Sequence, residues 1–298
     1  MNYYINTTLI TAKINNINVN FKMECDQPTG SFKIRGMNRL IAEYKTSGVT
    51  EIISSSGGNA GYSAAYIAQK MDLKCTVVIP EYTTQKAKNL ILSTGAEVIV
   101  HGTIWHDANE KALELVQDKN AGYISPFDHP LLWEGHASLI EECAAMMDEP
   151  EAIAVAVGGG GLLCGVLEGM KKVGWNSDII SCETQGAKSF NKCLETGKWE
   201  KLESINTVAG SLGAKQVAKQ AYKEIQNFNF NPNTVSDQIA IKSSIYFHED
   251  FKEEVEVACG AALSSVYFPN HNYKSILVIA CGGIGNTISE LKSLVTEQ

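Results

Sequence analysis

The sequence lacks the features of a membrane-spanning or nucleic-acid-binding protein. Its apolar stretch without a charged residue, residues 152–167, spans only 16 residues and includes five glycines, whereas a membrane-spanning helix needs roughly 20 mostly apolar residues. Basic residues are outnumbered by acidic ones, 25 against 33, so the net charge at pH 7 is −8. This charge is unfavourable beside the phosphates of nucleic acids and anionic lipids. We therefore expect a small-molecule partner, with neither a nucleic acid nor a membrane as partner.

Signals for secretion, for metal sites and for common nucleotide cofactors are also missing. Residues 1–20 contain neither a basic segment followed by an apolar one nor an arginine-rich amphipathic pattern, which predicts a cytoplasmic protein. The eight cysteines are widely spaced and form no CxxC pair, so neither a disulfide framework nor a zinc site is expected. The glycine run 158–161 does not continue as GxGxxG, and no GxxxxGKS/T motif occurs, which disfavours NAD and ATP.

The pattern of apolar residues predicts an α/β fold. At about 150 residues per domain, the 298 residues, 44% of them hydrophobic, allow two domains with sizeable cores. Runs rich in valine and isoleucine alternate with segments of helical period, as in βαβ units with a mostly parallel sheet. The predicted strands are 51–55, 74–79, 97–100 and 122–125 in one unit, and 153–157, 178–182 and 275–280 in a second. The predicted helices are 60–70, 84–93, 106–119, one ending at 147, 162–172, 214–226, 238–251, 258–268 and one from 286, and residues 227–233 are expected to form a polar loop.

Lys33 is the first candidate for chemistry. It lies in residues 28–36, where a turn leads into a predicted helix with Ser31 as its N-cap. The positive end of the helix dipole disfavours an ammonium ion in the first turn, so Lys33 should favour the neutral, nucleophilic amine. The alternative from spacing alone is an ordinary solvated lysine.

Three loops follow predicted strands and can direct backbone amides or a polar side chain toward a ligand. Residues 158–162, four glycines and Leu162 before a helix, predict a phosphate site, with a close-packed glycine turn as the alternative. Residues 54–61, rich in serine and glycine, can equally hold an anion or form an ordinary turn. Cys281 is interpreted as a polar contact or a buried structural cysteine, because no histidine is placed by the sequence to activate it.

A reactive amine, a phosphate loop and the lack of NAD or ATP motifs together fit pyridoxal phosphate, which requires a Schiff-base lysine and a phosphate site. The sequence resembles the serine dehydratase branch of the fold type II, tryptophan synthase β-like family, whose members use this cofactor. The resemblance rests on SFKIRG from Ser31, the loop 55–61, PFDHPLLWEGHAS from Pro126 and GGGGLLCGV from Gly158, and it spans essentially the whole chain. It implies two open, mostly parallel twisted sheets flanked by helices.

The resemblance implies a role for each candidate residue. The family's motif lysine, here Lys33, forms the Schiff base and later acts as the base, and Phe32 lies against the cofactor ring. Asn59 matches an asparagine that contacts the cofactor's phenolic oxygen. Cys281 matches the residue that hydrogen-bonds the pyridine nitrogen, which a thiol leaves neutral. The phosphate is assigned to Gly158, Gly159, Gly160, Gly161 and Leu162, the substrate to Ser55, Ser56, Gly57, Asn59 and Ala60, and a monovalent cation such as potassium to Gly158, Glu183, Ala187, Ser189, Leu212 and Ala214.

The domain organisation is also supplied by the resemblance. It implies a large, discontinuous domain that binds pyridoxal phosphate, made of residues 1–37 and 129–298, and a small domain, 38–128, that carries the substrate loop. The cofactor is expected between the two domains. A homodimer is expected on the same grounds.

The activity that the resemblance implies is dehydration of L-serine to pyruvate and ammonia by β-elimination, with L-threonine giving 2-oxobutanoate. Related racemases carry a serine as the acid of the opposite face where this chain has Gly57, which favours dehydration over racemisation. Val257 replaces a proline common at its position. The alternatives are a threonine-preferring dehydratase, a serine racemase, a non-catalytic cofactor-binding homologue and an α/β protein that binds another phosphate metabolite.

Overall fold

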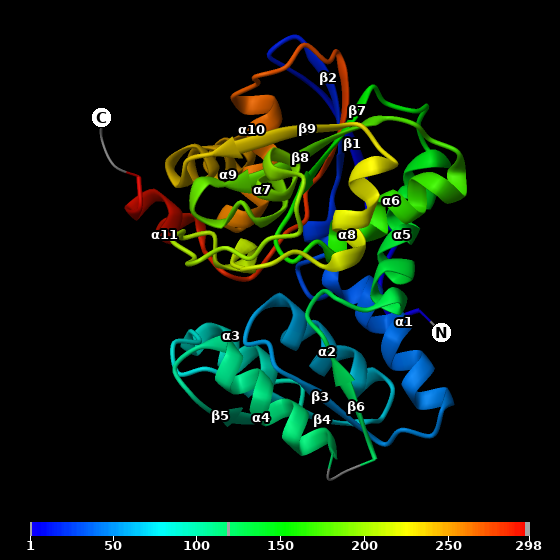
Figure 1. The fold of residues 1–298 in the computed structure, drawn as a ribbon, viewed down its shortest axis with the longest axis vertical. Helices are drawn as coiled ribbons and strands as arrows, with labels where there is room; N and C mark the ends of the chain where they lie inside the picture. Colours follow the sequence, from blue (N-terminus) through cyan, green and yellow to red (C-terminus); the bar gives the residue numbers. More distant parts are fainter. Residues whose placement is uncertain (1, 118–119, 296–298) are drawn as a thin grey trace.

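The computed structural model describes residues 2–117 and 120–295, and this part of the chain forms two β-sheets (Figure 1). The six-stranded sheet has the order β1-β2-β10-β7-β8-β9, and the four-stranded sheet has the order β5-β4-β3-β6. The β1–β2 hairpin is antiparallel, and the other neighbouring strands of both sheets are parallel. The strands are β1 (Leu9–Ile14), β2 (Ile17–Lys22), β3 (Glu51–Ser54), β4 (Lys74–Ile79), β5 (Glu97–Val100), β6 (Ala121–Ile124), β7 (Ala152–Ala156), β8 (Asp178–Thr184), β9 (Phe230–Val235) and β10 (Ser275–Ile279). The predicted α/β class with two mostly parallel sheets is confirmed.

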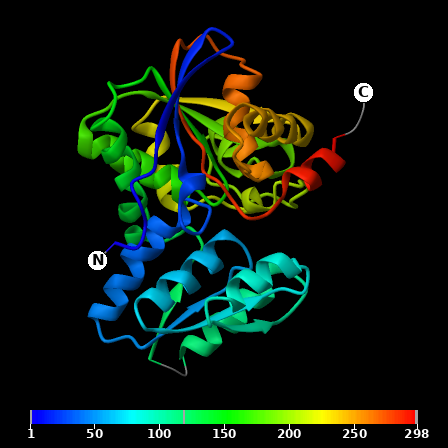
Figure 2. The same ribbon diagram turned by 180° about the vertical axis from the view of Figure 1, so that it is seen from behind.

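Helices flank both sheets, as Figure 2 shows from behind. They are α1 (Lys33–Thr46), α2 (Asn59–Lys70), α3 (Gln85–Leu92), α4 (Trp105–Gln117), α5 (Pro130–Ala144), α6 (Gly161–Val173), α7 (Ser189–Thr196), α8 (Lys219–Lys223), α9 (Asp237–Phe251), α10 (Val257–Tyr267) and α11 (Ile288–Ser293). None of the helices within residues 2–117 and 120–295 combines the length and the apolar character needed to cross a membrane.

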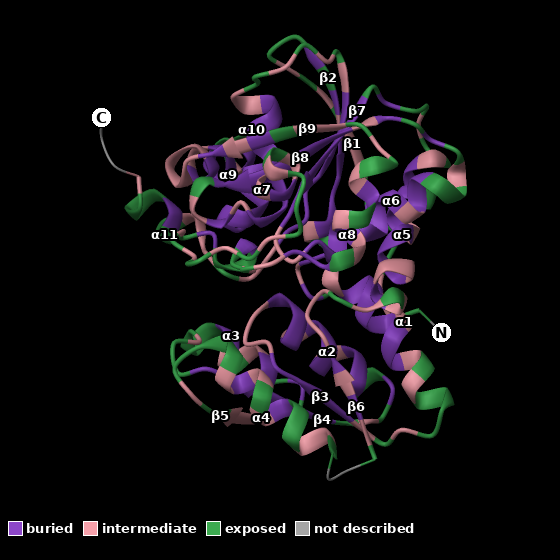
Figure 3. Ribbon diagram, in the orientation of Figure 1, coloured by how far each residue is buried: buried purple, intermediate pink, exposed green. Residues whose placement is uncertain are grey.

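The core explains why the strands were visible in the sequence. Every residue of β7 is buried, and so is every residue of α10 except its last, Tyr267 (Figure 3). Parallel strands covered by helices on both faces must be apolar throughout, so they appear as continuous apolar runs. The predicted strands therefore agree with the observed ones to within two residues at each end.

Helices α1 and α5 pack against each other. They approach closely because glycines face each other: a Cβ built on Gly135 would lie 2.6 Å from the carbonyl oxygen of Arg35 and 2.7 Å from the Cα of Gly36. The strands of the four-stranded sheet lie within residues 51–124, and those of the other sheet end by residue 22 or begin at residue 152 or later. The limits 37/38 and 128/129 of the two domains stay a prediction.

Several parts of the fold differ from the predictions. The polar loop predicted for 227–233 is wrong in its second half, because Phe230–Val235 forms the edge strand β9, where Pro232 and the polar residues are tolerated. The helix predicted for 214–226 is wrong in its first part, because helical structure begins only at Lys219: Lys219–Lys223 is α-helical and Glu224–Gln226 forms a short 3-10 helix. The hairpin β1–β2 and helix α7 were not predicted. The end of the helix predicted for 106–119 lies outside the described residues.

Candidate active site

Lys33 lies in the first turn of α1, as predicted, and is its first residue, but Ser31 is not the N-cap. The N-cap is Phe32, which makes no side-chain capping bond. Ser31 instead pairs with Gly282 in an isolated β-bridge, and its buried hydroxyl makes no hydrogen bond in the described part of the chain. The bridge, together with a hydrogen bond of 3.3 Å from the Phe32 amide to the Cys281 carbonyl, ties the start of α1 to the loop after β10. A capping prediction from local sequence fails here because the tertiary pairing takes its place.

The environment of Lys33 favours the neutral amine. Its Nζ donates a hydrogen bond of 2.6 Å to the carbonyl oxygen of Pro126 and lies 5.0 Å from the centre of the Phe32 ring. Burial lowers the pKa of Lys33 to about 8, against the opposing effects of Glu256 and Cys281. An amine with such a pKa is a better nucleophile and base near neutral pH than a solvated lysine.

The glycine loop 158–161 follows β7 and leads into α6. Gly160 has φ +86°, in the left-handed region, and is the N-cap of α6. A Cβ on Gly159 would lie 2.3 Å from the Phe127 ring, and one on Gly158 would lie 2.6 Å from the carbonyl oxygen of Ser211. Side chains are therefore excluded from this loop by its neighbours.

These glycines fit a phosphate group. In residues 2–117 and 120–295, the amides of Gly158, Gly159 and Gly160 donate no hydrogen bond to a protein acceptor. The first amides of a helix likewise have no partner within the helix. A group of free amides at the positive end of a helix is suited to an anion. Leu162, in the first turn of α6, is 4% exposed.

Asn59, the first residue of α2, connects the predicted substrate loop to Glu256 and to the loop after β10. Its Nδ2 donates a hydrogen bond of 3.0 Å to Oε1 of Glu256, and its Oδ1 accepts one of 2.9 Å from the amide of Ile284. Glu256 Oε2 also accepts a hydrogen bond of 3.2 Å from the amide of Gly285. The structure thus brings Asn59 to the loop after Cys281, while its contact with a cofactor stays a prediction.

Glu256 is a residue of this site that the sequence reasoning missed. It is 5% exposed, and burial raises its pKa, although hydrogen bonds from Ser211 and Asn59 oppose the shift. The available signal was an acidic residue directly before the apolar helix α10. Carboxylates are almost never fully buried unless they are paired, so an acid that begins a buried helix deserved a place among the candidates.

Cys281 follows β10 and is 6% exposed. A hydrogen bond with the Cys259 thiol raises the pKa of the Cys281 thiol well above its ordinary value, and burial is the second cause of this rise. The thiol is therefore neutral near pH 7. This agrees with a polar contact and argues against a nucleophile, because the thiolate is the reactive form.

The hydroxyls of the predicted substrate loop are turned in different directions. Ser55 is buried and donates a hydrogen bond of 2.8 Å to Oδ1 of Asn109, away from the loop. Ser56 accepts one of 3.4 Å from the amide of Gly58. Ala60 is 3% exposed. A contact of these residues with a substrate carboxylate stays a prediction, and the Ser55 side chain is already engaged.

Contacts in the described part of the chain connect some of the residues predicted to bind a cation. The hydroxyl of Ser189 donates to the carbonyl oxygen of Gly158 at 3.5 Å, and a Cβ on Gly158 would lie 3.1 Å from the Cα of Leu212. The amide of Ala214 donates to the Leu212 carbonyl at 2.7 Å, and Ala187 ends a short 3-10 helix.

Glu183, the one charged member of that set, is fully buried. Its two oxygens accept hydrogen bonds of 2.9 and 2.7 Å from the amides of Phe190 and Asn191, in the first turn of α7. Burial raises the pKa of Glu183 to about 8. These bonds satisfy the carboxyl group within the protein, so the cation site stays a prediction.

Comparison with known proteins assigns the chain to a family. The family described as "Pyridoxal-phosphate dependent enzyme" matches residues 2–282. An L-serine dehydratase of Dictyostelium discoideum is 39% identical over 95% of this chain and 87% of its own length. A serine dehydratase-like protein of Homo sapiens is 41% identical over 92% and 88%.

Solved structures agree with this assignment. A fungal L-serine ammonia-lyase from Rhizomucor miehei superposes with a TM-score of 0.92 at 30% identity, over 99% of this chain and 100% of that one. The processed threonine deaminase isoform 2 from Solanum lycopersicum superposes with a TM-score of 0.88 at 26% identity, over 98% and 84%. The chain therefore belongs to the family of pyridoxal-phosphate-dependent enzymes, in its fold type II branch with the serine and threonine dehydratases.

Proposed function

We propose that this chain is a pyridoxal-phosphate-dependent lyase that converts L-serine to pyruvate and ammonia and L-threonine to 2-oxobutanoate and ammonia. The observation that carries the proposal is the Lys33 amine, whose pKa burial lowers to about 8, at the start of a helix tied to the Cys281 loop. Relatives that are 39% identical and named L-serine dehydratase support the substrate class.

The residues that would hold the cofactor are those of the candidate site. Lys33 would bind it covalently, the amides of 158–162 would bind its phosphate, and Cys281 would contact its ring nitrogen. Phe32 would lie against the ring and Asn59 would contact its phenolic oxygen. When bound, the cofactor supplies an electron sink for the negative charge that develops at the α-carbon of the substrate.

The chain's own residues then hold and move protons. The neutral Lys33 amine takes the proton from the substrate α-carbon, because a base whose pKa lies near the working pH combines a large unprotonated fraction with adequate strength. The Pro126 carbonyl oxygen, 2.6 Å from Nζ, orients the amine. The neutral thiol of Cys281 adds no charge beside the ring.

Racemisation is the alternative that the loop disfavours. It requires an acid on the face of the substrate opposite Lys33, and Gly57 provides no side chain there. A threonine-preferring dehydratase would be recognised by comparing keto-acid formation from the two amino acids. A non-catalytic homologue is disfavoured because Lys33 and the glycine loop are both present.

A cation, a dimer and a cytoplasmic location complete the proposal. A monovalent cation such as potassium near Gly158 and Glu183 predicts higher activity in potassium than in tetramethylammonium chloride of equal ionic strength. A homodimer predicts about twice the chain mass in light scattering. A cytoplasmic location predicts recovery in the cytosolic fraction after cell fractionation.

The test is keto-acid release by the purified protein with pyridoxal phosphate and L-serine, beside Lys33→Ala. Wild-type release that disappears in Lys33→Ala, with loss of the yellow absorbance, is the expected result. Lys219→Ala is the matched control, because Lys219 is also the first residue of a helix but is exposed. A protein that binds no cofactor, or a Lys33→Ala variant as active as the control, would refute the proposal.

A further inference from the structure

Gly57, in the substrate loop, lies against the side chain of Thr83 from the loop after β4. A Cβ built on Gly57 would lie 2.5 Å from Oγ1, 2.7 Å from Cγ2 and 3.2 Å from Cβ of Thr83. All three distances are shorter than ordinary contacts between heavy atoms. The threonine side chain therefore occupies the space that a side chain at position 57 would fill.

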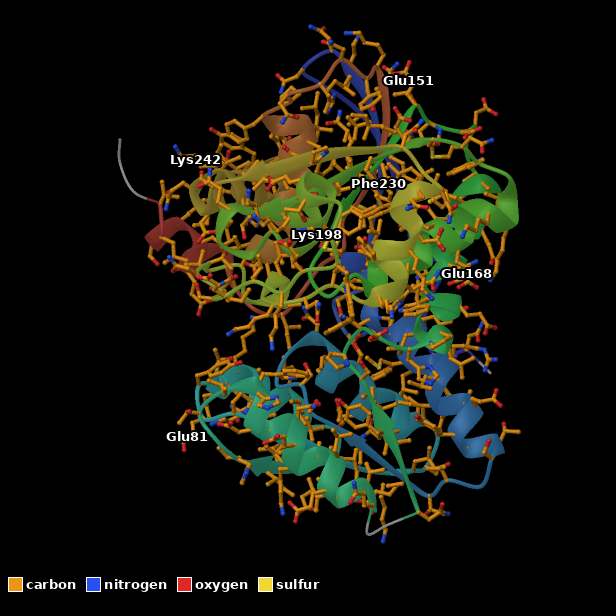
Figure 4. All side chains as sticks on the ribbon, in the orientation of Figure 1. Glu81, Glu151, Glu168, Lys198, Phe230 and Lys242 are labelled. Atoms are coloured by element: carbon orange, nitrogen blue, oxygen red, sulfur yellow. The ribbon has the colours of Figure 1, made fainter. Side chains whose placement is uncertain are left out.

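Thr83 is held in this place by its backbone. Its amide donates a hydrogen bond of 3.1 Å to the carbonyl oxygen of Pro80, and the amide of Glu81, labelled in Figure 4, donates one of 3.0 Å to the Gly102 carbonyl. The next residue, Thr84, caps α3 by accepting a hydrogen bond from the amide of Ala87. A β-branched side chain on a fixed backbone has few rotamers, so Thr83 cannot easily move aside.

The Thr83 side chain also differs from the serines of the neighbouring loop. The hydroxyls of Ser55 and Ser56 are hydrogen-bonded within the protein, and that of Ser54 is buried. Thr83 is half-buried.

Gly57 belongs to the same short loop as Asn59, which is bonded to Glu256 within the candidate site. We propose that Thr83 is a specificity-determining residue. Its side chain fills the space that a side chain at position 57 would occupy, and it forms the wall of the substrate pocket that faces the β-carbon of the substrate. The wall accepts the CH₂OH group of L-serine and crowds the additional methyl group of L-threonine. This inference rests on the proposed dehydratase function.

The kinetic test compares kcat/KM for L-threonine and L-serine in wild type, Thr83→Ala and Thr83→Val. One methyl group in a pocket changes kcat/KM by roughly tenfold or more. Thr83→Ala should therefore raise the threonine-to-serine ratio by about that factor, whereas Thr83→Val, which keeps the shape, should keep the wild-type ratio. The matched control is Thr50→Ala, an exposed threonine directly before β3, at the end of the strand opposite the loop.

The contact itself is tested without cofactor or substrate, by thermal unfolding. Gly57→Ala should lower the midpoint, and adding Thr83→Ala should restore most of the loss, because the two shortest contacts, at 2.5 and 2.7 Å, are then removed. Equal destabilisation by Gly57→Ala in both backgrounds would refute the contact. An unchanged ratio of kcat/KM in an active Thr83→Ala enzyme would refute the specificity role alone, whereas a wild-type protein that releases no keto acid from either amino acid would refute the proposed function and this role with it.

Discussion

Replacing Arg35 by methionine tests the packing that holds the lysine helix in place. Arg35 lies two residues after Lys33, and its side chain is fully buried. Its guanidinium donates to Glu24 at 2.7 and 2.8 Å and to Glu142 at 2.6 and 2.8 Å. The pairs connect α1 to the segment after β2 and to α5. Arg35 is therefore the centre of a buried ionic network next to the candidate site.

The magnitude follows from what the substitution leaves behind. Glu24 is 0% exposed and, among the described residues, would keep only Thr7 and Gln27 as side-chain partners, at 2.7 and 3.3 Å. Removing one member of a buried ion pair costs about 3–5 kcal/mol, because the other charge stays buried without compensation. With an unfolding entropy of about 2.1 cal/mol/K per residue, this loss lowers the unfolding temperature of a 298-residue chain by about 5–8 °C.

The assay is calorimetric unfolding of the cofactor-free protein, with Arg39→Met as the matched control. Arg39 lies on the same helix and pairs with Glu43 and Glu134, but its side chain is 35% exposed, so its loss should cost less than about 1 kcal/mol. The double variant Glu24→Met/Arg35→Met should recover part of the loss, because no isolated carboxylate remains at position 24. Equal unfolding temperatures for Arg35→Met and Arg39→Met would refute the reasoning.

Two further predictions concern the glycine loop and the buried acid. Gly159→Ala should weaken binding of pyridoxal phosphate by about 5- to 150-fold in an absorbance titration, because its Cβ would lie 2.3 Å from the Phe127 ring and such overpacking costs about 1–3 kcal/mol. Gly210→Ala, with nothing within 4 Å of its Cβ, should bind the cofactor normally. Burial raises the pKa of Glu183 from 4.5 to about 8. Between these two pH values the folded chain keeps a proton that the unfolded chain has lost, so the folded state becomes less stable as the pH rises. The contribution of this group to stability is therefore complete below pH 4.5 and is lost as the pH rises to about 8. Glu183→Gln should therefore show a smaller fall in unfolding temperature between pH 5 and pH 8 than wild type, and parallel curves would contradict the raised pKa.

The sequence located those parts of the site whose chemistry depends on the local backbone conformation. The glycine loop needs residues without side chains directly after a buried strand, and that requirement is visible as four consecutive glycines. Lys33 became a candidate from its position at the start of an amphipathic helix, and the family resemblance gave it its role. Glu256 and Thr83 were missed, because each reaches the site through a contact with a residue distant in sequence, Asn59 or Gly57.

The sequence by itself determined the α/β class, the buried parallel strands and the positions of Lys33 and the glycine loop. These depend on apolar runs, helical period and glycine, which are properties of short segments. Only the tertiary structure decided that Ser31 pairs with Gly282 instead of capping α1, and that residues 230–235 join the larger sheet as its edge strand. It also decided that burial lowers the pKa of Lys33. Pairing and desolvation arise when distant segments come together, and no local pattern records them.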